Sequence, residues 1–368
     1  MFVNSQEEKL LPEVSLVFPP LVTTNFGNYY PSTAILSGYL KAHGFYTKQT
    51  DLNEDFALFL LQPERLEEMA KGVFELDEVL KEDALPCVAA RLLIKNRDKL
   101  FDDLGRHQFQ EKALAPTHLL KSIAEVYQTD LDFSELERPD FYNTPVASFY
   151  EKFYEWSGYV ENLSQHIHTI GISVPLGLQL IPALILARHI KSRLPDITLV
   201  FGGPTLSLMS KYKLDQLLRC TTQVDAVIRF EGEVALLSVV EQCRNSTWEP
   251  TTIPNLSFFT ENSVRHNDPI SGPKLNLLPY GDYDKELLAR LSEPEIGIIQ
   301  ARGCYWGKCA YCDYVQLYEG SPSYRTSTVN RFIEEMKYQI KLHGHNRFAI
   351  ITESIPPPIC LQNEQSDY

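Results

Sequence analysis

The chain has 368 residues, and 44% of them are hydrophobic, so it can bury the cores of two or more domains of the usual ~100–200 residues. Its formal net charge of −14 at pH 7 disfavours nonspecific nucleic-acid binding, which depends on clustered Lys and Arg side chains. Apolar runs stay well short of the ~20 residues that span a bilayer, and the polar start lacks a secretory signal pattern, so we expect a cytoplasmic protein without membrane contact.

The N-terminal part predicts a strand, a helix and a second strand, followed by an insertion. Residues 14–18 are short and apolar, and residues 31–43 have helical spacing between a proline start and a glycine stop. Residues 46–52 predict the second strand, which completes a βαβ unit. Residues 54–160 are rich in Leu, Glu, Lys, Phe and Tyr and predict a helical insertion. The aromatic stripe of a helix near residues 148–163 is expected in the core.

The alternation of strands and helices then resumes. Strands are predicted at residues 169–174, 197–201 and 224–228, with an edge strand at 253–260. Because helices separate the strands, we predict a parallel, Rossmann-like sheet in a domain that spans residues 1–260. Ligands of such sheets bind at the carboxyl ends of the strands. The loops that follow the strands should therefore share one rim.

A second α/β unit follows this domain. Residues 261–294 are interrupted by Asn, Asp, Pro and Gly, and we expect a linker there. The new unit occupies residues 295–368. It begins with a strand at 296–300, continues with a helix at 327–342 and reaches a second strand at 348–351, which makes one further βαβ unit.

Three of the seven cysteines lie within nine residues, on the loop after the strand at 296–300: Cys304, Cys309 and Cys312. In a reducing compartment, clustered cysteines bind metal more often than they form disulfides. Three thiolates can each reach a different iron of a cubane cluster and leave the fourth iron open to a small ligand. The spacing of four residues and then two also fits a closed iron–sulfur or zinc site with Cys360 as its fourth ligand, and purely structural thiols are a further alternative.

The cysteine loop resembles the radical SAM superfamily. The matching residues are the strand Gly297–Gly303, the three cysteines, and Tyr311, the aromatic residue just before the last cysteine. The four-residue spacing departs from the usual three. The resemblance implies a 4Fe–4S cluster on the three cysteines, whose open iron binds S-adenosylmethionine. It further implies reductive cleavage of that cofactor to a 5′-deoxyadenosyl radical.

The resemblance also implies how S-adenosylmethionine is held. Tyr311 is expected near the adenine, and Thr352 and Glu353, at the end of the following strand, are expected to contact the methionyl amine. The implied partners are a reductant such as flavodoxin or ferredoxin and a small-molecule or peptide substrate. The loop cations Arg302 and Lys308 are expected to be solvated, as most such side chains are, and the alternative is that they steer the acidic cofactor or a redox partner.

The N-terminal domain resembles the cobalamin-binding class of the same superfamily. The matching segments are Phe18–Pro20, Phe201–Pro204 and Phe230–Glu233, the last similar to a Gly-Glu-Gly-Glu element with Phe230 in place of the first Gly. The residues that this resemblance implies for cobalamin are Gly202, Gly203, Glu231, Gly232 and Glu233. The class's histidine motif, Asp-x-His-x-x-Gly, is absent from the sequence. Base-off cobalamin without a protein ligand and an empty scaffold both remain open.

The predicted fold is therefore α/β: an N-terminal Rossmann-like parallel sheet with a helical insertion, followed by the first βαβ unit of a partial, TIM-like radical SAM barrel. That barrel needs several βα units, and residues 295–368 supply one, so we expect a truncated form. The predicted function is radical modification or methylation driven by S-adenosylmethionine cleavage, with cobalamin assisting. The alternative is a non-catalytic module that holds a cluster or cobalamin.

Overall fold

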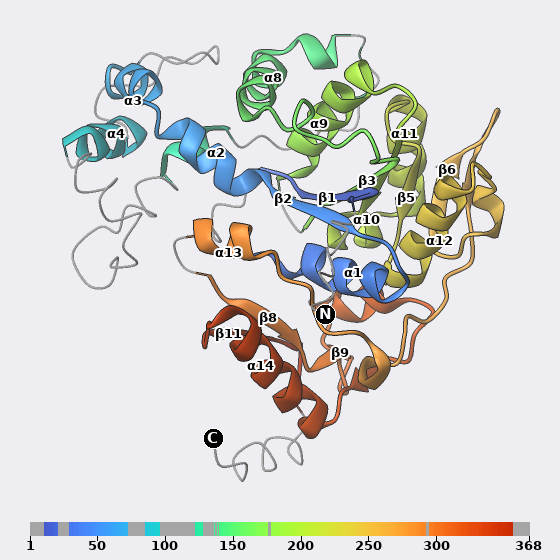
Figure 1. Ribbon diagram of the computed structural model, residues 1–368. Coiled ribbons are helices and arrows are strands. Elements are labelled where there is room, and N and C mark those ends of the chain that lie inside the picture. Colours follow the sequence, from blue (N-terminus) through green and yellow to red (C-terminus); the bar gives the residue numbers. More distant parts are fainter. Residues whose placement is uncertain are drawn as a thin grey trace, which may run out of the picture.

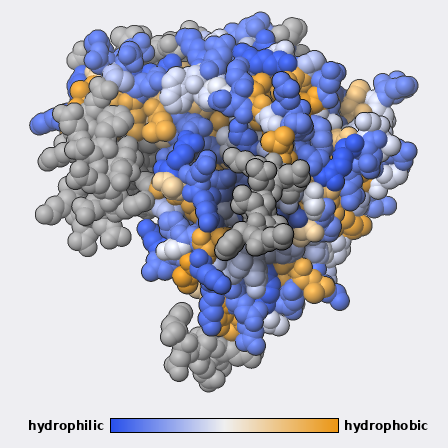
Figure 2. Space-filling model, viewed as in Figure 1, coloured by the Kyte–Doolittle hydropathy of each residue, from blue (hydrophilic) through white to orange (hydrophobic). Residues whose placement is uncertain are grey.

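The computed structural model describes residues 11–20, 29–72, 85–95, 122–127, 136, 138, 140–175, 178–291 and 294–355. These residues form an α/β fold around a mainly parallel sheet of seven strands, with a smaller α/β unit beside it (Figure 1). The predicted fold class is confirmed. Hydrophilic residues dominate the face in Figure 2, where hydrophobic residues gather in small separate groups. None of the described helices is long and apolar enough to cross a membrane.

The large sheet has the strand order β2-β1-β3-β4-β5-β6-β7. Its strands are β1 (Val14–Phe18), β2 (Thr47–Asp51), β3 (Thr169–Ser173), β4 (Thr198–Gly202), β5 (Ala226–Ile228), β6 (Leu256–Phe259) and β7 (Val264–His266). The strands β1 to β5 pair in parallel, whereas β6 and β7 are added antiparallel at one edge. The predicted strand at 253–260 is present as β6, but β7 covers it and forms the edge. This short, polar strand lies in the stretch 261–294 that we expected to be a linker.

Helices cover both faces of the large sheet (Figure 1). One face carries α1 (Pro31–Ala42) and α12 (Glu233–Arg244), and the other carries α8 (Pro145–Ser157), α9 (Leu180–Arg193) and α11 (Lys211–Cys220). Side chains alternate between the two faces along each strand. Leu16 and Val200 join the core under α1 and α12, whereas Val17 and Phe201 join the opposite core. Burial on both faces explains why the central strands β1, β4 and β5 are mainly apolar.

The described part of the chain between β2 and β3 is helical, as predicted. It comprises α2 (Leu52–Leu60), α3 (Pro63–Ala70), α4 (Leu85–Lys95), the 3-10 turns Glu125–Tyr127 and Phe141–Asn143, and α8. Phe56 of α2 packs against Phe149 and Phe153 of α8, with ring centroids 6.1 and 5.1 Å apart. These two members of the aromatic stripe are buried as expected. Trp156 is 44% exposed, because α8 ends one residue later.

The smaller unit contains the second predicted βαβ element. β8 (Ile296–Ile299) and β11 (Phe348–Ile351) pair in parallel, and α14 (Val329–His343) connects them. Thr328 caps α14, because its hydroxyl accepts a hydrogen bond from the backbone N–H of Arg331 at 3.3 Å.

An antiparallel pair that the sequence did not predict lies between β8 and α14. β9 (Ala301–Gly303) pairs with β10 (Tyr324–Thr326). The cysteine loop therefore joins two antiparallel strands, whereas we expected it to run from a strand into a helix. The backbone N–H of Cys304 donates to the carbonyl of Ser323 at 2.8 Å and closes the base of the loop.

The segment after β7 contacts both units. On the side of the smaller unit, Gln339 of α14 donates a hydrogen bond to the Gly281 carbonyl at 2.7 Å. The backbone of Tyr280 approaches α1 so closely that a β-carbon on Gly38 would lie 2.2 Å from the Tyr280 carbonyl oxygen. Asp282 binds α1 through Lys41 and Ser37, at 2.6 and 2.9 Å. The next residues form α13 (Lys285–Arg290). Much of the stretch 261–294 is thus packed against the N-terminal domain.

Replacement of Gly203 by alanine should destabilise the protein. Gly203 has a φ of 111°, and a β-carbon there would lie 2.3 Å from the Val174 carbonyl oxygen. With ψ 173°, this backbone conformation is one that essentially only glycine adopts, at a cost on the order of 1–3 kcal/mol for other residues, and the clash with backbone adds to it. Gly44→Ala is the matched control, because Gly44 has a φ of +81° but no heavy atom within 4 Å of the added carbon. Urea unfolding should show a clearly larger loss of unfolding free energy for Gly203→Ala than for Gly44→Ala. Equal losses would contradict the close packing of Gly203 against Val174.

Candidate functional site

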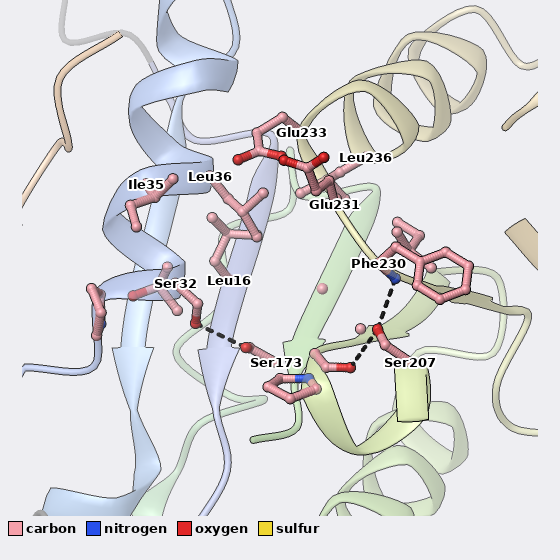
Figure 3. Close-up of a pocket in the computed structure, with 18 of the residues that line it drawn as sticks. Leu16, Ser32, Ile35, Leu36, Ser173, Ser207, Phe230, Glu231, Glu233 and Leu236 are labelled. Carbon is pink, nitrogen blue, oxygen red and sulfur yellow. Dashed lines mark hydrogen bonds between the residues drawn. The ribbon is translucent and has the colours of Figure 1, made fainter. Parts of the chain in front are cut away.

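A cavity of about 260 Å³ opens at the carboxyl ends of the parallel strands (Figure 3). The chain places β2 on one side of β1 and β3 on the other, so the strand order reverses between β1 and β3. Such a switch point leaves a crevice in which α/β sheets bind ligands. Leu16 and Leu36 line it with mainly apolar surface. At one side, Ser32 of α1 donates a hydrogen bond to Ser173 of β3 at 2.8 Å.

The residues that sequence reasoning assigned to cobalamin come together in the wall of this cavity. They are Gly202, Gly203, Glu231, Gly232 and Glu233. The two glycines of the β4 turn differ in their surroundings. A β-carbon on Gly203 would strike the Val174 backbone, whereas one on Gly202 would meet only ordinary contacts, the nearest at 3.5 Å from the Ile228 carbonyl oxygen. Gly203 is thus required by backbone packing, and Gly202 leaves space in the cavity.

The smaller unit closes the cavity on the side away from the sheet. Its contributing residues are Ile299, Arg302, Leu317, Tyr318 and Ile351. They come from β8, β9, β11 and η5 (Tyr314–Tyr318), a 3-10 helix that follows the cysteines. The cavity therefore lies between the two units, and residues on either side of the cysteine loop, Arg302 before it and Leu317 and Tyr318 after it, form part of its wall.

Phe230 adopts a backbone conformation that bulky residues rarely take. Its φ is 61°, in the left-handed region, where a non-glycine residue costs on the order of 1–3 kcal/mol. The radical SAM element that residues 230–233 resemble has glycine at this place. The backbone N–H of Phe230 donates to the Ser207 hydroxyl at 2.7 Å, which holds the turn (Figure 3). The turn directs the side chains of Glu231 and Glu233 towards the smaller unit.

A buried ionic cluster joins the units at this turn. Arg302 of β9 donates to Glu231 at 2.6 Å and also binds Glu233, and all three residues are at most 9% exposed. Arg325 of β10 and Ser321 bind the same Glu231 carboxylate. Two arginines thus balance two glutamates in a place with little water. We call these four charged residues the ionic cluster.

Two members of the ionic cluster, Glu231 and Arg302, have shifted pKa values. Burial opposes the charged form of Glu231, but the Arg302 charge and the hydrogen bonds from Arg325 and Ser321 outweigh it and lower the pKa of Glu231 to about 2. Burial likewise opposes the charge of Arg302, but Glu233 and Glu231 raise the pKa of that guanidinium above its ordinary value. Glu231 and Arg302 therefore stay ionised at neutral pH.

The three predicted cysteines lie on one accessible loop directly beyond the ionic cluster. Cys309 is exposed, and Cys304 and Cys312 are partly exposed. A hydrogen bond from the backbone N–H of Gly307 to Cys304 Sγ, at 3.4 Å, and the Ser354 hydroxyl lower the pKa of the Cys304 thiol. Within the described residues, no three His, Cys, Asp or Glu side chains converge closely enough to share one metal ion. Cys360, the alternative fourth ligand, lies outside the described residues.

The residues assigned to S-adenosylmethionine lie at two places on the smaller unit. Thr352 and Glu353 follow β11 and lie next to Ser354, whose hydroxyl contacts Cys304. Glu353 accepts a hydrogen bond from Tyr318 at 2.8 Å, and its Oε2 is buried without a partner. Tyr311 is 92% exposed on the cysteine loop. The structure thus brings Glu353 near Cys304 and leaves Tyr311 in solvent.

Sequence reasoning missed most of the side chains that build this site. Arg302, which we expected to be solvated, is 9% exposed and lies in the ionic cluster, so that expectation was wrong. The roles of Arg325, Ser321 and Tyr318 were not predicted. Arg302 and Arg325 lie 71 and 94 residues from Glu231 in sequence, and no local pattern indicates such pairing.

Comparisons with known proteins show which solved structures share this fold. No protein-family model and none of the curated proteins match the chain. Among solved structures, the chain is similar to the cobalamin-dependent S-adenosylmethionine radical enzyme OxsB with aqua-cobalamin and S-adenosylmethionine bound, with a TM-score of 0.51, 15% identity, and coverage of 95% of this chain and 35% of that chain. The apo, selenomethionine-labelled OxsB structure gives a TM-score of 0.50 and 13% identity, with the same coverage. The chain spans about a third of OxsB, and the likeness shows a shared α/β fold.

Removal of Arg302 should cost far more stability than removal of an exposed arginine. Arg302→Met leaves Glu231 and Glu233 buried with less positive charge, which typically costs about 3–5 kcal/mol. Arg347→Met is the matched control, because the Arg347–Glu295 pair has side chains 49% and 32% exposed, and such pairs contribute about 0–1 kcal/mol. Urea unfolding of the two variants measures the difference. Similar losses would show that the ionic cluster adds no more than a surface pair.

The contribution of Glu231 to stability should disappear in acid. Its pKa is about 2 in the folded protein and 4.5 in the reference state, so its stabilising effect is complete above about pH 5 and falls as the pH drops towards 2. The full effect is about 3 kcal/mol, and roughly 2 kcal/mol of it should be lost by pH 3. The difference in the free energy of unfolding between wild type and Glu231→Gln should therefore narrow by roughly 2 kcal/mol between pH 6 and pH 3. A constant difference across that range would contradict the lowered pKa.

Proposed function

We propose that this chain is part of a radical SAM iron–sulfur protein that reductively cleaves S-adenosylmethionine, with cobalamin assisting a radical modification or methylation. The observation that carries the proposal is the placement of the cysteine loop. The loop leaves β9 after Gly303, one residue beyond Arg302, which the ionic cluster holds in the wall of the switch-point cavity. The fold likeness to OxsB supports this assignment at the level of architecture.

The donor set of the loop suits a cubane cluster. Each thiolate of such a cluster binds a different iron, and three cysteines within nine residues would supply three of its four iron ligands. All three thiols are accessible, and the backbone of Gly307, with φ +59°, wraps towards Cys304. When bound, a 4Fe–4S cluster would supply the electron that cleaves the sulfonium of S-adenosylmethionine.

The residues beside Cys304 fit the amino group of S-adenosylmethionine. Glu353 Oε2 is a buried acceptor without a partner among the described residues, and a buried carboxylate oxygen that lacks a donor is costly. A ligand ammonium group would satisfy both its charge and its hydrogen-bonding capacity. The side chain of Thr352 is turned away from this role, because it donates to the Ser354 carbonyl at 3.0 Å. We therefore assign the amine contact to Glu353.

The cavity fits part of a planar cofactor such as cobalamin. Its volume of about 260 Å³ lies below the ~300–1,000 Å³ of typical ligand pockets, so a whole cobalamin would extend beyond it. The apolar lining from Leu16, Leu36 and Leu236 suits a flat ring. Glu233 Oε2 is buried without a hydrogen-bond partner and would accept from an amide N–H. None of the residues that line the cavity is a histidine, so the described wall offers cobalt no imidazole ligand.

Anaerobic reconstitution with iron and sulfide tests the cluster. We expect the spectrum of a 4Fe–4S cluster, a change of its electron paramagnetic resonance signal on addition of S-adenosylmethionine, and 5′-deoxyadenosine on reduction. Cys304→Ala should lose most of the bound iron. Cys243→Ala is the control, because that thiol lies on α12 and hydrogen-bonds to Thr198 at 3.2 Å.

The same experiment distinguishes a closed four-cysteine site. In that case Cys360→Ala would abolish cluster binding, and S-adenosylmethionine would leave the spectrum of the wild-type cluster unchanged. In the radical SAM case, Cys360→Ala would retain both the iron and the response to S-adenosylmethionine. A reconstituted cluster that responds to S-adenosylmethionine but forms no 5′-deoxyadenosine would favour a binding module over an enzyme. We also propose that a reductant such as flavodoxin or ferredoxin supplies the electron and that the substrate is a small molecule or a peptide.

Cobalamin binding is tested by filling the cavity. Gly202→Val adds a side chain where only ordinary contacts surround the β-carbon, so the variant should fold and still occupy part of the cavity. We expect at least tenfold weaker binding of hydroxocobalamin, measured by the change of its absorption spectrum, because bulk in a close-packed pocket displaces ligand atoms. Gly44→Ala lies away from the cavity and serves as control. Unchanged affinity in Gly202→Val would place cobalamin elsewhere.

A further inference from the structure

One hydrogen bond connects the cavity wall with the candidate S-adenosylmethionine site. Tyr318 ends the 3-10 helix that follows the cysteines, and its side chain lines the cavity together with Leu317. Its hydroxyl donates to Glu353 Oε1 at 2.8 Å, across 35 residues of sequence. The same side chain therefore touches the cavity and holds the carboxylate beside Cys304.

The Glu353 carboxylate is fixed at one oxygen and free at the other. Tyr318 occupies Oε1, and Oε2 is buried with no partner among the described residues. A carboxylate held in this way presents its second oxygen in one direction, which lowers the entropic cost of binding a donor group. Among the described contacts of the Glu353 carboxylate, the Tyr318 hydroxyl is the hydrogen bond that fixes its orientation.

The Tyr318 hydroxyl is a dependable donor. Burial, and then the neighbouring Glu353 charge, raise its pKa far above that of an ordinary tyrosine. The phenol therefore keeps its proton throughout the physiological range. Tyr314, four residues earlier on the same 3-10 helix, is 45% exposed and offers a matched comparison.

We propose that Tyr318 is a positioning residue that orients Glu353 for the amino group of S-adenosylmethionine. The inference rests on the proposed function, since it assumes that Glu353 meets this cofactor. Tyr318 acts through Glu353 and has no contact with the reacting atoms. Because its ring lines the cavity, removal of the hydroxyl alone leaves the cavity wall in place.

Tyr318→Phe tests the proposal in the reconstituted full chain. We expect about tenfold weaker binding of S-adenosylmethionine, the effect of one lost hydrogen bond to a charged group, measured by titration of the cluster's electron paramagnetic resonance signal. Iron content and hydroxocobalamin affinity should equal those of the wild type, which separates positioning from a general loss of structure. Tyr314→Phe should leave S-adenosylmethionine binding unchanged. Equal affinity in Tyr318→Phe and wild type would overturn the proposal.

A double-mutant cycle shows whether Tyr318 acts through Glu353. Glu353→Ala alone removes the acceptor of the Tyr318 hydroxyl and should weaken S-adenosylmethionine binding, and adding Tyr318→Phe should weaken it no further. Additive losses would mean that Tyr318 acts independently of Glu353, which contradicts the proposal. If the wild-type chain forms its cluster and does not respond to S-adenosylmethionine, the proposed function itself fails. The inference about Tyr318 alone fails if the wild type responds to S-adenosylmethionine and Tyr318→Phe binds this cofactor equally tightly.

Discussion

The ionic cluster is the interaction on which the arrangement of the two units depends. Glu231 and Glu233 enter it from the start of α12, and Arg302 and Arg325 enter it from the β9–β10 pair. Removing these charges from water costs several kcal/mol per ion, and only mutual pairing with further hydrogen bonds offsets that cost. The four charges are paired only while the smaller unit lies against the start of α12. The ionic cluster therefore favours this arrangement of the smaller unit and the large sheet.

The cavity and the cysteine loop consequently share their supporting residues. Arg302 lines the cavity, binds both glutamates and lies two residues before Cys304. Tyr318 lines the same cavity and hydrogen-bonds to Glu353 beside the loop. Backbone strain gathers at the same rim, where Phe230 has a positive φ and Gly203 lies against Val174. Strain of this kind persists only where the surrounding structure holds it, and it is common around ligand sites.

Much of the fold could be predicted from the sequence because its signals are local. The strands β1 and β3 to β5 are short apolar runs, and α1 and α14 carry recognisable starts and stops. β7 and β10 escaped prediction because each has three residues and is defined only by its pairing partner. β9 was predicted as the end of the strand Gly297–Gly303, but its separate pairing with β10 was not. For the site, the five cobalamin-assigned residues were found near one another because loops after parallel strands meet at one rim.

The sequence by itself determined the parallel α/β architecture, the rim of the sheet and the loop that carries Cys304, Cys309 and Cys312. These follow from hydrophobic periodicity, turn residues and close cysteine spacing, which are properties of neighbouring residues. Only the tertiary structure decided that Arg302 is buried, that Arg325 meets Glu231 and that Tyr318 holds Glu353. These contacts join residues far apart in the chain, and their strength comes from burial, which exists only after the two units have packed together.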